Sequence, residues 1–172
     1  MTELNIMVKP LILVTMGTND YPFTRLYEYI KSDPLYSTDS CDWFIQTGAC
    51  EVSDPPMSGD VEKLIPRNDM EQLVQRSALV ISHCGIGSLN LMLQYGKRVI
   101  FVPRVSAHNE FSDDHQLQIA REIKNRKMTV VYPGDDFPTL DLSQIESDNL
   151  ITNPVDITNY DLARVVELKL TA

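Results

Sequence analysis

The sequence predicts an α/β fold, a Rossmann-like, doubly wound parallel sheet in a single domain of residues 1–172. Three observations support it. Short apolar runs that are typical of buried strands alternate with segments of helical spacing. Glycines and polar residues follow several of these runs, where ligands bind in such sheets. A chain of 172 residues is long enough for one ordinary core, and no internal repeat or second core is visible.

The apolar runs predict strands over residues 11–16, 43–46, 63–65, 78–82, 99–102 and 128–132. Helical spacing predicts helices over residues 23–30, 69–76, 89–95, 112–127 and 159–170. Polar or irregular sequence is expected to form loops over residues 53–60, 104–111 and 133–157. A core of about residues 11–132 would then carry an acidic extension over 133–172.

Local signals mark several helix ends. Pro34 closes the first helix, and Asn68 or Asp69 caps the second. Gly96 lies just past the third, as a C-terminal stop does. In the long helix at 112–127, two aspartates would occupy the first turn and basic residues the last turn, and both placements suit the helix dipole.

Composition excludes some classes of function. The net charge of −9 disfavours binding to nucleic acid, whose partners are usually basic. No apolar run approaches the roughly 20 residues that span a bilayer, and the N-terminus lacks a secretory signal pattern. We therefore expect a cytoplasmic chain that reaches a membrane only if another molecule holds it there. The three cysteines lack metal-ligand spacing and are expected to be reduced thiols.

The strongest local signal is a glycine-rich turn between a strand and a helix, His83-Cys84-Gly85-Ile86-Gly87-Ser88. A helix N-terminus offers unpaired N–H groups and partial positive charge, and glycines let a phosphate approach them. The alternative is a turn that only packs strand against helix. A dinucleotide fingerprint is poorly matched, because Asn90 stands where a third glycine belongs and Val105 where an acid would bind ribose.

A second signal is Glu110-Phe111-Ser112-Asp113-Asp114-His115-Gln116, at the start of the long helix. Gln116 shares the inward face of that helix, and Asp114, His115 and Gln116 could hydrogen-bond a polar ligand such as a sugar. The alternative is an acid-rich first turn that only stabilises the helix.

Two further loops, Gly17-Thr18 and Gln46-Thr47-Gly48, follow strands at the same predicted edge. Each alone is an ordinary loop. Other catalytic patterns are missing: there is no Walker loop, no G-x-S-x-G elbow and no H-E-x-x-H. A catalytic pair of Cys84 with a distant histidine stays open as a minor alternative.

Together these pieces resemble the C-terminal domain of the glycosyltransferase family that contains the peptidoglycan N-acetylglucosaminyltransferase. The similarity is greatest to its short members, which are subunits of two-part enzymes of N-glycan precursor, capsule and exopolysaccharide synthesis. The matching segments, in chain order between residues 11 and 127, are LVTMGTNDYPFTRL, FIQTG, LVISHCGIGS, GKRVIFVPR and NEFSDDHQLQIA.

The resemblance implies the C-terminal, donor-binding half of a GT-B glycosyltransferase. Thr18, Gly85, Gly87 and Ser88 would hold the diphosphate of a UDP-sugar, and Asp114, His115 and Gln116 would contact its sugar. Further candidates in the cleft are Gly17, Gln46, Gly48, His83, Arg104 and Glu110.

The sequence departs from the family at two places. Leu91 stands where the family commonly has an acid for the ribose, so that either Asn90 replaces the acid or the ribose is held elsewhere. Glu110-Phe111 stands before the long helix, where the bacterial subunits often have a Glu-His pair.

The predicted function is transfer of a hexose or N-acetylhexosamine from UDP to a lipid-linked saccharide acceptor. A membrane-anchored, acceptor-binding partner subunit would recruit the chain to the cytoplasmic face of a membrane. No cofactor or metal is expected, since an Asp-x-Asp motif is missing. The general base is not identified and could belong to the partner. The alternative is a regulatory or scaffolding subunit that has lost donor binding. An epimerase of the same two-half fold would need a longer chain.

Overall fold

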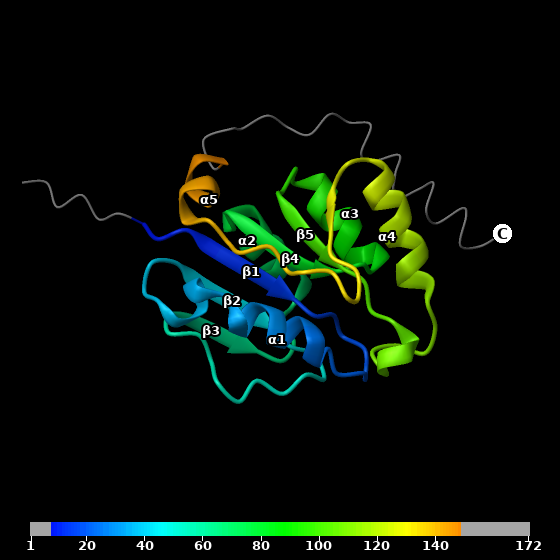
Figure 1. Ribbon diagram of the computed structural model, residues 1–172. Helices are drawn as coiled ribbons and strands as arrows, with labels where there is room; N and C mark the ends of the chain where they lie inside the picture. The colour runs from blue at the N-terminus through cyan, green and yellow to red at the C-terminus, as the bar shows by residue number, and fades with distance from the viewer. Residues whose placement is uncertain (1–7, 149–172) are drawn as a thin grey trace, which may run out of the picture.

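The structure is a computed structural model that describes residues 8–148 (Figure 1). Its strands are β1 (Leu11–Thr15), β2 (Asp42–Gln46), β3 (Gly59–Glu62), β4 (Leu79–His83), β5 (Val99–Val102) and β6 (Thr129–Val130). Its α-helices are α1 (Thr24–Ser32), α2 (Arg67–Arg76), α3 (Ile86–Gln94), α4 (His115–Asn125) and α5 (Leu142–Asp148). Two short 3₁₀-helices are η1 (Pro34–Ser37) and η2 (Ser106–His108). The predicted helix at 159–170 lies outside the described residues.

The six described strands form one parallel sheet in the order β3-β2-β1-β4-β5-β6. From β1 the chain first winds toward β3 and then returns to β4, so the order reverses between β1 and β4. This reversal is the topological switch point of a doubly wound sheet, where the connections diverge and leave a crevice at the carboxyl ends of the strands. The predicted fold class is therefore confirmed.

The core has two layers because the central strands β1, β4 and β5 are buried on both faces. Along β1, Ile12 and Val14 belong to one apolar cluster and Leu13 to the other. The first cluster includes side chains of α1 and α5, and the second includes side chains of α2, α3 and α4. Alternating side chains of a strand point to opposite faces, and here both faces are covered. The strands therefore appear in the sequence as continuous apolar runs.

The edge strand β3 differs from the prediction. A strand was expected at 63–65 and a polar loop at 53–60, but β3 occupies Gly59–Glu62. It pairs with β2 from Gly59 opposite Trp43 to Glu62 opposite Gln46, and its side chains are largely exposed. A side chain at Gly59 would overlap the carbonyl of Trp43, so glycine permits this close pairing. An exposed edge strand carries no apolar pattern, which is why the sequence did not reveal it.

Several helix boundaries also differ from the prediction. Helix α2 begins at Arg67, with Pro66 at its N-cap position, so the expected caps Asn68 and Asp69 lie inside the helix. Helix α3 begins at Ile86, three residues earlier than expected, and brings the second half of the glycine-rich turn into its first turn. Helix α4 begins at His115 and ends at Asn125, so that both aspartates precede it.

The segment after β6 is better ordered than the sequence suggested. It crosses the sheet and ends in α5, which the aspartate Asp141 caps by accepting from the amide of Ser143 (Figure 1). Leu140 and Ile145 are buried in the same apolar cluster as Ile12 and Val14 of β1. The buried carboxylate of Asp33 accepts from the amide of Leu140 at 2.8 Å and from that of Leu35 at 2.9 Å. This region therefore extends the single core.

Within residues 8–148, no helix is both long and apolar enough to cross a membrane. The three cysteines are free thiols, and all three are buried.

Candidate functional site

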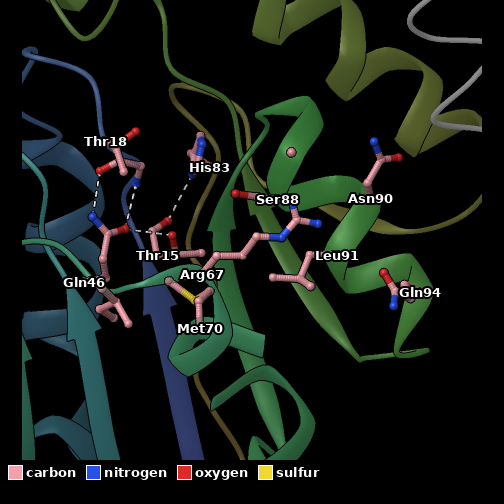
Figure 2. Close-up of a pocket in the computed structure, with 13 residues that line it drawn as sticks. Thr15, Thr18, Gln46, Arg67, Met70, His83, Ser88, Asn90, Leu91 and Gln94 are labelled. Carbon is pink, nitrogen blue, oxygen red and sulfur yellow. Dashed lines mark hydrogen bonds between the residues drawn. The ribbon is translucent and has the colours of Figure 1, made fainter. Parts of the chain in front are cut away.

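A cavity of about 560 Å³ opens at the switch point, beside the carboxyl ends of β1 and β4. Gly17 and Thr18 line it from the loop after β1, and His83, Gly87 and Ser88 from the turn after β4. Figure 2 shows Thr18, His83 and Ser88 around the cavity, with side chains of α2 and α3 on its other walls. The structure thus brings together three of the four loops that the sequence singled out, and adds the start of α2.

The N-terminus of α3 is free to bind an anion. Gly85 occupies the N-cap position with no side-chain cap, and the first turn contains no acidic residue. The amide of Leu89 makes the first intrahelical bond, to the carbonyl of Gly85 at 2.9 Å, so the amides before it have no partner within the helix. These amides and the helix dipole make this wall of the cavity electropositive.

The two glycines of the turn serve different purposes. A Cβ atom at Gly85 would lie 2.9 Å from Cδ2 of His83, and closer still to its Nε2, so packing requires glycine there. A Cβ atom at Gly87 would have no neighbour within 4 Å. Gly87 also lines the cavity and is exposed. Nothing in the described protein fills that space, so the empty space at Gly87 is available to a ligand.

Gln46 fixes the loop after β1. Its side-chain oxygen accepts from the hydroxyl of Thr15 at 2.8 Å and from the amide of Gly17 at 3.1 Å. Its amide nitrogen donates to the carbonyls of Gly17 at 2.8 Å and Lys63 at 3.1 Å. Gly48 packs directly against the carbonyl of Gly17, where a side chain would not fit. Gln46 and Gly48 therefore position Gly17, and only Gln46 of the two also lines the cavity.

His83 stands between the two glycine loops. Its Nδ1 lies 3.3 Å from the carbonyl oxygen of Thr15, which assigns the proton to Nδ1 and leaves Nε2 toward the glycines at positions 17 and 85. Burial, with a smaller contribution from the positive charge of Arg104, lowers the pKa of His83 to about 4. The imidazole is therefore neutral at pH 7 in the unliganded protein.

Three residues on α3 form the wall farther from the turn, and they are Asn90, Leu91 and Gln94. Asn90 and Leu91 are the two positions that the sequence left open for ribose binding, and both reach the cavity. Leu91 presents an apolar group there. Gln94 was not anticipated, although its position four residues after Asn90 puts it on the same helix face.

The wall opposite α3 was also missed. It consists of Ile65, Arg67 and Met70, which surround the start of α2. Two of these side chains are apolar and one is a cation. The sequence offered no sign of them, because their composition is that of any loop followed by an exposed helix.

The predicted sugar-binding residues do not line this cavity. Gln116 is buried, and its side-chain oxygen accepts from the amides of Cys84 and Arg104, at 3.1 Å each. It therefore joins the turn after β4 to the loop after β5. Asp114 and His115 are exposed. The carboxylate of Asp114 accepts from the amide of Ser106 at 2.9 Å, so this residue organises the loop before α4 instead of occupying the first helical turn.

Arg104 and Glu110 also lie outside the cavity lining, in a buried network of charged groups. Arg104 donates to the carbonyls of Met16, Tyr21 and Glu110. Glu110 forms an ion pair with Arg25, whose Nη2 lies 2.8 Å from a carboxylate oxygen. The network joins the loop after β1 to the loop after β5, and so holds the cavity rim in place. A sequence alone does not distinguish such buried charges from charges that line a cleft.

Comparison with known proteins identifies a family. Residues 11–144 match the glycosyltransferase family 28 C-terminal domain. No curated protein matches the chain.

Solved structures of glycosyltransferases have a similar fold. The glycosyltransferase of kitacinnamycin superposes with a TM-score of 0.57 at 16% identity, over 94% of this chain and 40% of its own. The calicheamicin glycosyltransferase CalG4 gives 0.55 at 13% identity, over 95% of this chain and 40% of its own. MurG from Acinetobacter baumannii gives a TM-score of 0.50 at 17% identity, over 95% of this chain and 50% of its own. The chain therefore spans between 40% and 50% of the length of these enzymes.

Proposed function

The chain belongs to the glycosyltransferase family 28 C-terminal domains, and on this premise we propose that it is the UDP-sugar-binding subunit of a two-component glycosyltransferase. Its sheet has the Rossmann-like fold of the C-terminal half of a GT-B enzyme. That half would bind the donor, and a second chain would supply the acceptor-binding half. The single observation that supports donor binding best is the cavity in front of the uncapped N-terminus of α3.

The diphosphate would lie against the first turn of α3. The space beside Gly87 allows a phosphate oxygen to approach the backbone, and Ser88 and Thr18 offer hydroxyl groups from two sides. In the transfer, an acceptor hydroxyl attacks the anomeric carbon while the bond from that carbon to the diphosphate oxygen breaks. The hydroxyl proton passes to a general base, which would belong to the partner half. Charge grows on the departing UDP, and fixed N–H dipoles are well placed to stabilise it.

The nucleoside and the sugar would lie on either side of the diphosphate. Asn90 and Gln94 provide amide groups that could bind ribose hydroxyls in place of the acid that Leu91 replaces. Gln116 uses its side-chain oxygen within the protein, so its amide nitrogen would be the sugar contact, assisted by Asp114 and His115. These roles are proposals that rest on the resemblance and on the position of the residues around the glycine-rich turn.

Calorimetric titration tests donor binding. We expect heat on addition of UDP or a UDP-sugar, and much less with NAD or ATP, because the glycine-rich turn lacks the dinucleotide fingerprint. At a free ligand concentration of 100 times Kd, binding should stabilise the fold by about 2.7 kcal/mol. Titration with millimolar UDP that gives neither heat nor a rise in Tm would overturn the proposal.

The partner half is the finer part of the proposal. The chain spans less than two thirds of the enzymes that it resembles, and a GT-B reaction needs a cleft between two halves. We propose a membrane-anchored subunit that binds a lipid-linked saccharide and recruits this chain to the cytoplasmic face. Membrane pelleting with and without the co-expressed partner tests this, together with a transferase assay of each preparation. Full activity of the purified single chain on a lipid-linked acceptor would refute the two-part arrangement.

A second candidate is a regulatory subunit without donor binding. Leu91 favours it, because an apolar side chain lines the cavity where the family commonly has an acid. The same titration separates the candidates. A regulatory subunit would bind no UDP but would still raise the activity of its partner.

A further inference from the structure

Arg67 is the one permanently charged side chain among the described residues that line the cavity. It occupies the first position of α2, on the wall opposite α3. Its side chain is 86% exposed, so it stands at the cavity mouth. Figure 2 shows it extended across the cavity in the direction of Ser88, at the N-terminus of α3. The side chain thus reaches toward the wall where the diphosphate would lie.

The charge of the protein makes this single cation important. The net charge is −9, and the N-terminus of a helix contributes only about half a positive charge. A nucleoside diphosphate carries at least two negative charges into the cavity. A guanidinium group binds two phosphate oxygens at once through parallel N–H donors. From the α2 wall it would reach the side of the diphosphate that faces away from the N-terminus of α3.

Arg67 has a weak partner on its own helix. Its Nε lies 3.1 Å from a carboxylate oxygen of Glu71, one turn along α2. The side chain of Glu71 is 27% exposed, and the side chain of Arg67 is far more exposed. Such an i, i+4 pair at the surface stabilises a helix only slightly, so a phosphate group can replace the carboxylate easily. The Nη groups stay available for a second acceptor.

We propose that Arg67 is a donor-binding residue, which exchanges Glu71 for the diphosphate and closes over it from the wall opposite α3. The proposal rests on donor binding by this cavity, as set out above. It assigns recognition of the diphosphate to two elements: α3 supplies fixed backbone dipoles, and α2 supplies a mobile cation. Glu71 acts as the competitor for the guanidinium group when no donor is bound.

The test is a ligand series with matched variants. Uridine, UMP and UDP are titrated into the wild type, Arg67→Gln and Arg76→Gln. Arg76 is exposed on the same helix but does not line the cavity, so its variant controls for the change in net charge. We expect Arg67→Gln to weaken UDP roughly tenfold, the lower end for a charge-assisted hydrogen bond, and to leave uridine unchanged. Arg76→Gln should leave both unchanged within about twofold.

Glu71→Gln tests the exchange itself. Removing the competing carboxylate should strengthen UDP binding by roughly twofold. In the Arg67→Gln background the same change should have no effect, since the cation it releases is gone. A loss of UDP affinity in Glu71→Gln would overturn the exchange.

The failure of this inference is distinguishable from failure of the proposed function. If the wild type binds no UDP, donor binding itself is refuted. If the wild type binds UDP and Arg67→Gln binds it equally well, the role of Arg67 is refuted while donor binding stands. An equal loss for uridine and UDP would place Arg67 at the nucleoside and refute its contact with the diphosphate. Thermal melts of each variant establish that the fold is intact.

Discussion

Gly87→Ala should make the protein slightly more stable and its donor binding much weaker. The two effects have opposite signs because Gly87 is not required by the fold. A Cβ atom there meets nothing within 4 Å, and the residue lies at the second position of α3. Glycine in a helix costs roughly 0.5–1 kcal/mol relative to alanine. Near a helix end the gain should be about 0.5 kcal/mol, or a rise in Tm of about 1–2 °C.

Donor binding should weaken because the alanine side chain would occupy the open space beside residue 87. The new methyl group would stand where a phosphate oxygen approaches the amides of the first turn. A hydrogen bond to a charged group contributes about 1.5–3 kcal/mol, so losing one such bond should weaken UDP roughly 10- to 100-fold. Calorimetry gives the affinity, and thermal melting without ligand gives the stability.

Gly85→Ala is the matched comparison, since it changes the other glycine of the same turn. Its Cβ atom would press on the imidazole of His83, so we expect this variant to lose stability.

If Gly87→Ala binds UDP as tightly as the wild type, the diphosphate does not lie against this turn. If it loses stability instead, Gly87 is a packing residue and the space beside it is not a ligand site.

Three further predictions concern the residues around the cavity. Gln116→Ala should cost about 2 kcal/mol of stability, because two buried amides lose their acceptor, and should weaken a UDP-sugar more than UDP; an equal loss for both ligands would remove Gln116 from the sugar site. His83 has a pKa of about 4 when folded against an ordinary value of 6.5, so the unfolded chain binds the extra proton between these values. Stability should therefore fall by up to about 3 kcal/mol as the pH drops from 6.5 to 4, and His83→Gln should remove that part of the slope in urea titrations at several pH values. Glu110→Ala should cost about 3 kcal/mol in urea unfolding, because it leaves the half-buried guanidinium of Arg25 without its ion pair; a loss below about 1 kcal/mol would show that the pair does not support the rim.

The sequence predicted those parts of the fold whose burial leaves a pattern. The strand at Leu11–Thr15 and the strand at Leu79–His83 are buried on both faces, so each is a continuous apolar run. The edge strand at Gly59–Glu62 is mostly exposed and has no such pattern. The helix at Leu142–Asp148 was missed because its apolar contacts to the core are few and lie in an acidic, proline-containing segment.

For the candidate site, too, only the residues within a recognisable pattern were predicted. The order of strands and glycine-bearing loops was enough to expect a cavity beside Gly87 and Ser88. Residues that reach it from ordinary helix surfaces, such as Arg67 and Gln94, carry no signal of their own. Arg104 was predicted as a candidate in the cleft, yet it donates to backbone carbonyls and does not line the cavity, because the burial of a charge depends on tertiary contacts.

Mapping UDP binding by NMR on uniformly ¹⁵N-labelled protein tests the central claim most directly. The largest amide shifts are expected at Thr18, Gly87 and Ser88, with smaller changes at the start of α2. All these positions line one cavity, and Figure 2 shows Thr18, Ser88 and Arg67 around it. Saturable shifts confined to these loops would support donor binding at the switch point. Saturable shifts that spare the glycine-rich turn, or none at millimolar UDP, would contradict it.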